Sequence, residues 1–208
     1  MRVAGSGLVL LTCCAAVSAQ RIDSIPDYLA EPPKLIVKLD MRGSFISNQT
    51  VQFAGIKLGL EHAGKVQYGL GYSFLLSPVE GSEHVDGVGV VGTRLRFGYV
   101  TPYFDFAFYQ KNNWELRIPV QFGIGSGSVV YDDAFGRTRT LEKSGVFLYE
   151  PGITVQYRFL KYFALGGGWG YRLVLRSADL GDGLTAPTYT LGLKIFFTDL
   201  WKDLNGGA

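Results

Sequence analysis

The chain has 208 residues, which suits a single domain, and its 20 lysine and arginine residues nearly balance 18 aspartate and glutamate residues. This balance argues against a general nucleic-acid partner and against a strongly acidic interaction tail. Glycine is abundant at 28 residues and aromatic residues reach 14%. Both are expected where strands pack around a filled interior and aromatic side chains mark two membrane interfaces.

Residues 1–19 have the pattern of a secretory signal peptide. A basic start at Arg2 precedes an apolar core, and the small residues Val17-Ser18-Ala19 close the segment. We expect cleavage after Ala19. Leu10-Leu11-Thr12-Cys13 also loosely matches a lipoprotein signal, which leaves lipidation of Cys13 as the alternative.

Both cysteines, Cys13 and Cys14, fall inside this segment. We therefore expect a mature chain without a thiol, a disulfide or a cysteine-based metal site. No later segment has the roughly 20 apolar residues that a spanning helix needs. Any membrane span in this chain is therefore expected to consist of strands.

Residues 20–33 are polar and contain Pro26, Pro32 and Pro33, so we expect an extended periplasmic leader. From Lys34 to Thr198 apolar residues alternate with polar or very small ones. In the first strand, for example, Leu39 and Met41 alternate with Asp40 and Arg42. This lipid-out, polar-in alternation predicts an all-β fold, an eight-stranded antiparallel up-and-down transmembrane β-barrel over residues 34–198.

The connections between the predicted strands alternate in length. The short ones are 62–64, 111–113 and 160–161, as in periplasmic turns, and the long ones are 77–90, 127–144 and 177–187. A turn at Asn48-Gln49-Thr50 is the one short outer connection. Both termini are then expected in the periplasm, as a closed bacterial barrel with an even strand number requires.

One region, residues 91–110, has two apolar registers in succession. Leu95, Phe97 and Tyr99 have odd numbers, whereas the following phenylalanines, from Phe104 on, have even numbers. Val100-Thr101-Pro102 is either a hairpin turn, which gives nine strands, or a bulge or bend inside one long strand. Because nine strands would not close with both termini on one side, we predict one bent strand with Arg94 and Arg96 facing the lumen.

Polar residues on the inward face should fill the lumen. An eight-stranded barrel is just wide enough to be packed by its own side chains, so we expect no conductance. The alternative is an anion site near one rim for lipopolysaccharide phosphates. The predicted lumen network comprises Lys38, Asp40, Arg42, Lys57, Glu61, Arg94, Arg96, Asp105, Glu115, Arg117, Gln121, Glu150, Gln156, Arg158, Arg172 and Lys194.

The outward face is rich in aromatic residues, and some of them should form girdles at the two membrane interfaces. The predicted girdle comprises Trp114, Tyr149, Tyr157, Phe159, Phe163, Trp169 and Tyr171. After the last strand, residues 199–208 form a periplasmic C-terminal tail. Its segment Asp199–Leu204 is compatible with one amphipathic helical turn that anchors to the membrane surface.

Catalysis would have to use one of two histidines. His62 falls in a predicted periplasmic turn, whereas His84 follows Ser82 and Glu83 in a predicted outer loop. Adjacent residues of an extended segment point in different directions, so we expect no triad and no enzyme, and no cofactor. A lipid-modifying enzyme centred on His84 is the alternative. The spacing of the outer-loop aspartates supports no more than weak binding of a divalent cation, so we expect no metal site. These aspartates are Asp132, Asp133, Asp179 and Asp182.

Four segments carry a resemblance to a known family. They are WELRIPVQFGIG (114–125), YEPG (149–152), GWGYR (168–172) and LGLKIFF (191–197). Through them the chain resembles the outer membrane protein beta-barrel domain family, which includes PorT-like and OmpX-like barrels. The resemblance covers most of residues 34–198 and implies a bacterial outer-membrane location.

These patterns lead to one functional expectation. We expect an outer-membrane barrel with a structural, adhesive or complex-partner role, and type IX secretion or envelope assembly as the alternative that the resemblance adds. The expected partners are outer-membrane lipid, lipopolysaccharide and another outer-membrane or periplasmic protein. Residues 127–144, with Tyr131 and Phe135 among charges, are the expected contact surface. The alternative is that the apolar residues of this loop extend the strands above the membrane.

Overall fold

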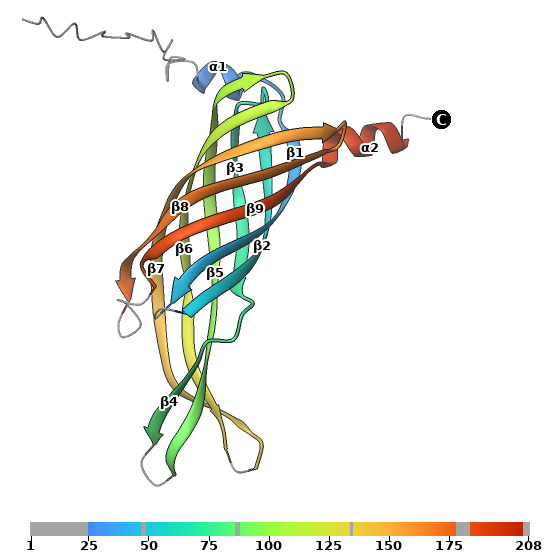
Figure 1. Cartoon of the computed structure of the whole chain (residues 1–208). Helices are drawn as coiled ribbons and strands as arrows, with labels where there is room; N and C mark the ends of the chain where they lie inside the picture. Colours follow the sequence, from blue (N-terminus) through green and yellow to red (C-terminus); the bar gives the residue numbers. More distant parts are fainter. Residues whose placement is uncertain (1–24, 47–48, 86–87, 134, 178–183, 206–208) are drawn as a thin grey trace, which may run out of the picture.

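A computed structural model describes residues 25–46, 49–85, 88–133, 135–177 and 184–205. The described residues form two helices and nine strands (Figure 1). The predicted signal segment, its cleavage position and Cys13 lie outside them. The elements are α1 (Ile25–Ala30), β1 (Lys34–Ile46), β2 (Gln49–His62), β3 (Val66–Leu75), β4 (Glu80–Val85), β5 (Gly89–Lys111), β6 (Trp114–Asp132), β7 (Thr138–Leu160), β8 (Phe163–Ser177), β9 (Ala186–Phe196) and α2 (Phe197–Asn205).

Eight of the strands close into a ring of antiparallel neighbours. The sheet order is β3-β2-β1-β9-β8-β7-β6-β5-β4, and pairing between β3 and β5 closes it. β4 is not one of the eight ring strands, because it pairs with β5 at 89–94 whereas β3 pairs with β5 at 98–106. The predicted eight-stranded antiparallel barrel is therefore confirmed. Neither described helix is long and apolar enough to cross a membrane.

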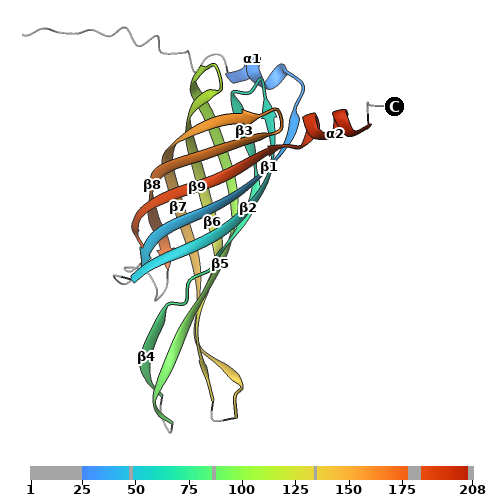
Figure 2. The same ribbon diagram turned by 45° about the vertical axis from the view of Figure 1, so that its right-hand side comes forward.

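Three strands are much longer than the ring is tall. β5 and β7 have 23 residues each and β6 has 19, and they run beyond the ring together with β4 (Figures 1 and 2). This extension lies at the end opposite to the described termini. It occupies most of the predicted loops 77–90 and 127–144, so these loops are largely extra strand. We call it the projecting sheet and define it as β4 with 89–97, 126–132 and 138–145.

β5 crosses the predicted bend without a register shift. Val100 pairs with Ile124 and Tyr103 with Gln121, so the register with β6 is the same on both sides of Pro102. The single long strand is thus confirmed, and of the two forms expected at Val100-Thr101-Pro102 a bulge is excluded. The shift between β5 and β6 lies between Ala107 and Tyr109 instead.

The N-terminal leader is partly helical, so the prediction of an extended segment is wrong for residues 25–30. Pro26 lies in the first turn of α1, where a missing backbone N–H leaves no intrahelical hydrogen bond unmade. The ring of Tyr28 lies 6.5 Å from that of Phe106 on the outside of the barrel. His62 Nδ1 lies 2.8 Å from the carbonyl oxygen of Glu31, so the leader packs against the barrel.

Candidate functional site: the filled barrel interior

The outer surface of the ring is a continuous apolar belt. Side chains at alternate positions of each strand are exposed, whereas their neighbours on the same strand are buried in the barrel. In a chain surrounded by water, so much exposed apolar surface would be unfavourable. Members of the belt include Leu39, Met41, Ile56, Leu58, Leu70, Tyr72, Phe104, Ile118, Phe122, Ile153, Leu165, Leu173, Tyr189 and Leu191.

The predicted girdle residues all lie on this outward face. Trp114 packs against Tyr157 with ring centroids 4.7 Å apart, and Phe159 stacks with Phe163 at 6.4 Å. These four lie next to the turns at the same end as the termini, which we call the terminal end. The other three, Tyr149, Trp169 and Tyr171, lie further along the barrel, as their cross-strand partners show.

Inside the barrel, Arg117 organises a cluster of charges toward the terminal end. Its Nε donates to Asp105 at 2.8 Å and its Nη1 donates to Glu115 at 2.6 Å. Lys38 contacts the other oxygen of Asp105 at 2.7 Å. Arg117 also donates to two backbone carbonyls of the turn after β2. A second chain of contacts runs through Glu61, which accepts from Lys194 at 2.8 Å and from Gln67 at 2.7 Å.

Glu150 organises a second cluster at mid-height. Its carboxylate pairs with Arg42 at 2.5 Å, and it also accepts from Arg172 and Gln121. The Tyr99 hydroxyl lies 3.4 Å from the same carboxylate. Arg42 and Lys57 both contact Asp40, at 2.8 Å and 3.5 Å. Because each charge has an opposite partner, the low-dielectric interior can hold all of them.

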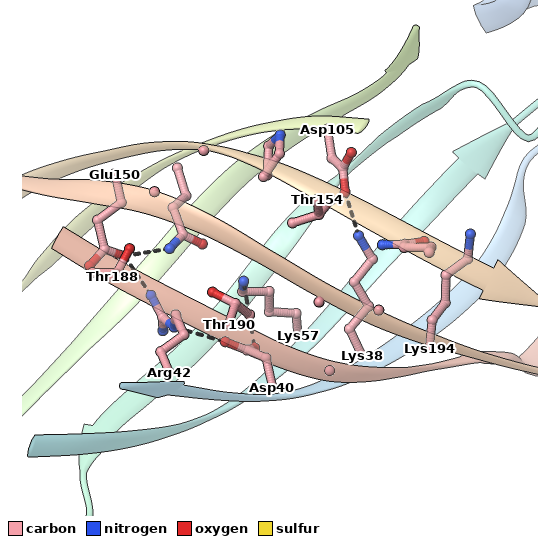
Figure 3. Close-up of a pocket in the computed structure, with 18 of the residues that line it drawn as sticks. Lys38, Asp40, Arg42, Lys57, Asp105, Glu150, Thr154, Thr188, Thr190 and Lys194 are labelled. Carbon is pink, nitrogen blue, oxygen red and sulfur yellow. Dashed lines mark hydrogen bonds and ion pairs between the residues drawn. The ribbon is translucent and has the colours of Figure 1, made fainter. Parts of the chain in front are cut away.

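A cavity lies among these charges, and small residues of β7, β8 and β9 also line it. It contains about 750 Å³ of space that no atom of the chain fills, open volume at its edges included. Figure 3 shows Lys38, Asp40, Arg42, Lys57 and Glu150 pointing into it from several strands. Its further lining includes Thr154, Gln156, Gly166, Gly170, Thr188, Thr190 and Gly192.

The cavity is polar enough to hold water. Thr154 Oγ1 and Gln156 Oε1 are buried and have no hydrogen-bond partner in the described part of the chain. Lys38, Lys57 and Lys194 already contact carboxylates. Each cation that faces the cavity is therefore already paired with a carboxylate of the barrel, so ordered water is a better occupant than a further anion.

Buried apolar clusters lie inside the barrel on both sides of the charges. At the terminal end, Ile36, Ala164 and Phe196 form a small buried cluster. Toward the projecting sheet a larger cluster, which we call the apolar plug, fills the barrel. It comprises Val51, Phe53, Val79, Phe97, Tyr99, Val146, Leu148 and Leu184. Val79 lies just before β4 and Leu184 just before β9, and both side chains are buried in the barrel mouth.

The predicted lumen position is wrong for two arginines, and the predicted lipid-facing position is wrong for two aromatic residues. Phe97 and Tyr99 were expected on the lipid face but are buried inside, and Arg94 and Arg96 were expected in the lumen but are exposed on the opposite face of β5. Arg94 pairs there with Asp132 at 2.5 Å. The reason is the continuous register of β5, which keeps odd-numbered residues inside from Thr93 to Ala107.

Other predicted lumen residues lie where the strand patterns place them. Six cations and five carboxylates form the two clusters: Lys38, Arg42, Lys57, Arg117, Arg172 and Lys194 with Asp40, Glu61, Asp105, Glu115 and Glu150. Gln121 and Gln156 are buried beside them. Arg158 lies at the terminal rim instead, where its guanidinium is 4.0 Å from the centroid of Phe196 and 3.3 Å from Asp199.

The apolar plug was not predicted from the sequence as an interior feature, although a signal for it was present. Val51 and Phe53 share the odd numbering of the inward Lys57 and Glu61 in β2. In β7, Leu148 has the same parity as the inward Glu150. Extending the inward parity beyond the charged positions would have placed these apolar residues inside.

Candidates for chemistry in the projecting sheet remain separate from one another. His84 is exposed in β4, opposite Val90, and no hydrogen bond within the described ranges joins it to Ser82 or Glu83. Asp132 and Asp133 contact Arg94 and Arg139, while Asp179 and Asp182 lie outside the described residues. Among the described residues no group of three or more His, Cys, Asp or Glu side chains is placed to hold a metal ion.

The closed ring, the apolar belt and the packed interior define the class: this is the fold of small outer-membrane β-barrels. Neisserial surface protein A has a similar structure, with a TM-score of 0.56 and 12% identity over 80% of this chain and 100% of that one. Ail of Yersinia pestis, solved with the heparin analogue sucrose octasulfate, has a TM-score of 0.49 and 15% identity over 78% of this chain and 97% of its own.

The N-terminal β-barrel domain of OprF from Pseudomonas aeruginosa is also similar, with a TM-score of 0.45 and 13% identity over 79% of this chain and 98% of that one. At these identities the likeness concerns the fold alone. No protein-family model matches the chain. No curated protein matches it significantly.

Proposed function

We propose that the chain is an integral protein of the bacterial outer membrane. In this proposal the barrel does not conduct, both termini lie in the periplasm, and the projecting sheet reaches outside the cell to contact a partner. The apolar belt supports the membrane part of the proposal. Burying such side chains in hydrocarbon is favourable by about 25 cal/mol per Å² relative to water.

The observation that carries the proposal is the packing of the interior. The apolar plug closes the lumen on the side of the projecting sheet, and Arg117, Arg172 and Leu148 are completely buried. Ions would have to displace paired charges in a low-dielectric interior, which is unfavourable. A transport role through an open lumen therefore has no support from this geometry.

Planar-bilayer recording tests the non-conducting lumen. The folded wild-type chain is reconstituted at a density confirmed by immunoblotting, and a known porin inserted under the same conditions is the positive control. We expect no discrete conductance steps from the chain. Reproducible steps from the wild-type protein would overturn this part of the proposal.

The projecting sheet supports a contact role. Phe135 at the tip between β6 and β7 is 88% exposed, and Val90 at the start of β5 is 76% exposed. Large apolar side chains at protruding tips are unfavourable in water unless a partner covers them. Phe135 and Val90 lie beyond the β3–β5 pairing that closes the ring. These tips and the belt therefore meet different surroundings.

Photocrosslinking in intact cells tests the contact role. A photoreactive residue is placed at Phe135, and a matched one is placed at Leu165 on the apolar belt. We expect protein adducts at position 135 and only lipid adducts at position 165. Absence of any protein adduct at position 135 in cells that carry the folded barrel would contradict the proposal.

Lipopolysaccharide is the lipid partner that we propose for the outer leaflet. Arg94 and Arg96 support it, because both are exposed on the outward face of β5 within the projecting sheet, and guanidinium groups pair well with phosphate. Arg96→Ala should weaken binding of the purified chain to lipopolysaccharide, while Arg139→Ala, at the sheet tip, should not. Equal binding by both variants and the wild type would count against this partner.

We further propose that the chain is not an enzyme, since His84 lacks an assembled partner set in the described structure. Membership of a type IX secretion or envelope-assembly complex stays a hypothesis within the same class. A stable partner recovered with the native membrane complex, and lost after Phe135→Ser, would favour it.

A further inference from the structure

Helix α2 is amphipathic and leaves its apolar face uncovered. It projects sideways from the terminal end of the barrel (Figures 1 and 2). Phe197, Trp201 and Leu204 are spaced by four and three residues, which places them on one helix face. Trp201 is 58% exposed and Leu204 is 70% exposed, and the rings of Phe197 and Trp201 stack at 6.1 Å.

The other face of α2 is tied to the barrel rim. Asp199 contacts Lys34 at 3.0 Å and Arg158 at 3.3 Å, and Asp203 accepts from the side chains of Lys161 and Tyr162. The backbone N–H of Leu35 donates to Thr198 Oγ1 at 2.7 Å. These contacts reach β1, the end of β7 and the β7–β8 turn. Because Asp199 and Asp203 are four residues apart, they fix the rotation of the helix about its axis.

The uncovered face of α2 continues the belt of the barrel. Along β9 the outward residues have odd numbers, ending with Leu193 and Ile195. Phe197 is the next in this series and is the first residue of α2. The aromatic pairs Trp114–Tyr157 and Phe159–Phe163 lie at the same end of the barrel. The apolar face of α2 therefore begins where the belt ends.

The size and charge of α2 favour lipid over a protein as the occupant of this face. A stable protein interface needs roughly 800 Å² from each partner, far more than three side chains on a nine-residue helix offer. An interfacial helix needs only an apolar face and cations that reach lipid phosphates. Lys202 is exposed on α2 and meets the second requirement.

We propose that α2 lies in the headgroup–acyl boundary of the periplasmic leaflet, with Phe197, Trp201 and Leu204 inserted among the lipid chains. This inference rests on the proposed outer-membrane function. The rim contacts of Asp199 and Asp203 orient the helix so that its apolar face meets lipid. The helix thereby fixes the depth of the terminal end of the barrel in the membrane.

Spin-label accessibility in vesicles of phosphatidylethanolamine and phosphatidylglycerol tests the proposal. The chain without residues 1–19 has no cysteine, so single cysteines are introduced by Trp201→Cys, Leu204→Cys and Lys202→Cys. Leu165→Cys and Leu191→Cys report on the belt. Accessibility to oxygen, which concentrates in lipid, is compared with accessibility to a water-soluble nickel chelate.

We expect labels at positions 201 and 204 to resemble the belt labels, with oxygen favoured, and the label at position 202 to favour the nickel chelate. If both belt labels favour oxygen but all α2 labels favour nickel, the inference fails and the barrel proposal stands. If both reagents are excluded from positions 201 and 204, protein covers the face and the inference also fails. Belt labels that favour nickel would overturn the proposed function itself.

A second variant isolates the orienting contacts. In the chain with Asp199→Asn and Asp203→Asn, the oxygen-to-nickel accessibility ratio should differ at least twofold less between positions 201 and 202 than in the wild type. The unfolding midpoint of the barrel should stay the same. An unchanged difference would show that the rim contacts do not orient α2. Lys143→Ala, on the projecting sheet, serves as the control and should change neither measurement.

Discussion

Arg117 and Asp105 form an ion pair of 2.8 Å across neighbouring strands, and both side chains are buried in the barrel interior. The pair joins β5 to β6, and through Lys38 it also reaches β1. Such a pair is stable only while both members are present, because removing one leaves a buried charge without a partner. The interior clusters therefore tie strands together that are distant in sequence.

The first prediction concerns this pair. Asp105→Asn should lower the free energy of unfolding by about 3–5 kcal/mol, because Arg117 and Lys38 lose their shared carboxylate. The matched control is Asp132→Asn, which removes the partner of Arg94 in a half-exposed pair and should change the free energy by less than about 1 kcal/mol. Urea unfolding in phospholipid vesicles measures both. Equal losses in the two variants would refute the buried network.

The second prediction concerns the apolar plug. Leu148 is completely buried within it, so Leu148→Ala should lower the free energy of unfolding by about 2–5 kcal/mol, through lost burial and a residual cavity. Leu173→Ala on the adjacent strand removes the same atoms from the lipid face. Lipid chains can fill the space there, so Leu173→Ala should lower the free energy of unfolding by clearly less than Leu148→Ala. The reverse order in the same unfolding assay would place Leu148 outside the core.

The third prediction concerns the close approach of two strands at Gly69. A Cβ added there would lie 2.1 Å from the carbonyl oxygen of Leu58 and 2.6 Å from the Cα of Gly59. Backbone atoms cannot yield as side chains can, so Gly69→Ala should destabilise the barrel by about 1–3 kcal/mol. Gly92→Ala is the control, since no atom lies within 4 Å of its added Cβ. Heat-modifiable mobility on gels gives the readout, and full folding of both variants would contradict the prediction.

The fourth prediction concerns pH and α2. Hydrogen bonds from the side chains of Lys161 and then Tyr162 hold the pKa of Asp203 below its ordinary value of 3.8. The stabilisation of a lowered carboxyl pKa is present above the ordinary value and is lost as the pH falls through the lowered one. A spin label at Leu204 should therefore gain mobility only in strongly acidic buffer, below pH 3.8. In Asp203→Asn the label should be mobile already at neutral pH. If the gain of mobility in acid persists in this variant, the titrating group is not Asp203.

The fifth prediction concerns catalysis. Cells that express the wild-type chain and cells that express His84→Ala should have the same lipid A by mass spectrometry, because His84 has no assembled catalytic partners in the described structure. Immunoblotting checks that both barrels are folded and equally abundant. A lipid A species that requires the wild-type chain and disappears with His84→Ala would revive the enzyme hypothesis.

Most face assignments followed from the sequence because the barrel wall has only two sides. In β1, Arg42 could be placed inside and Met41 outside from alternation alone, since a one-residue slip would expose every charge to lipid. The clusters around Arg117 and Glu150 were foreseeable as a set of inward charges. Their pairing was not, because Arg42 and Glu150 are 108 residues apart and meet only when the ring closes.

The sequence by itself determined the fold class, the single long strand at β5 and the side of the wall on which most residues lie. Only the tertiary structure decided the side for Arg94, Arg96, Phe97 and Tyr99. Alternation shows that two faces differ, and a lipid face and a plugged interior are both apolar. Beyond the belt, the outward face of the wall meets water and carries polar side chains, whereas the inward face packs on the apolar plug and carries apolar ones. There, only the hydrogen-bond register between distant strands settles which face is inside.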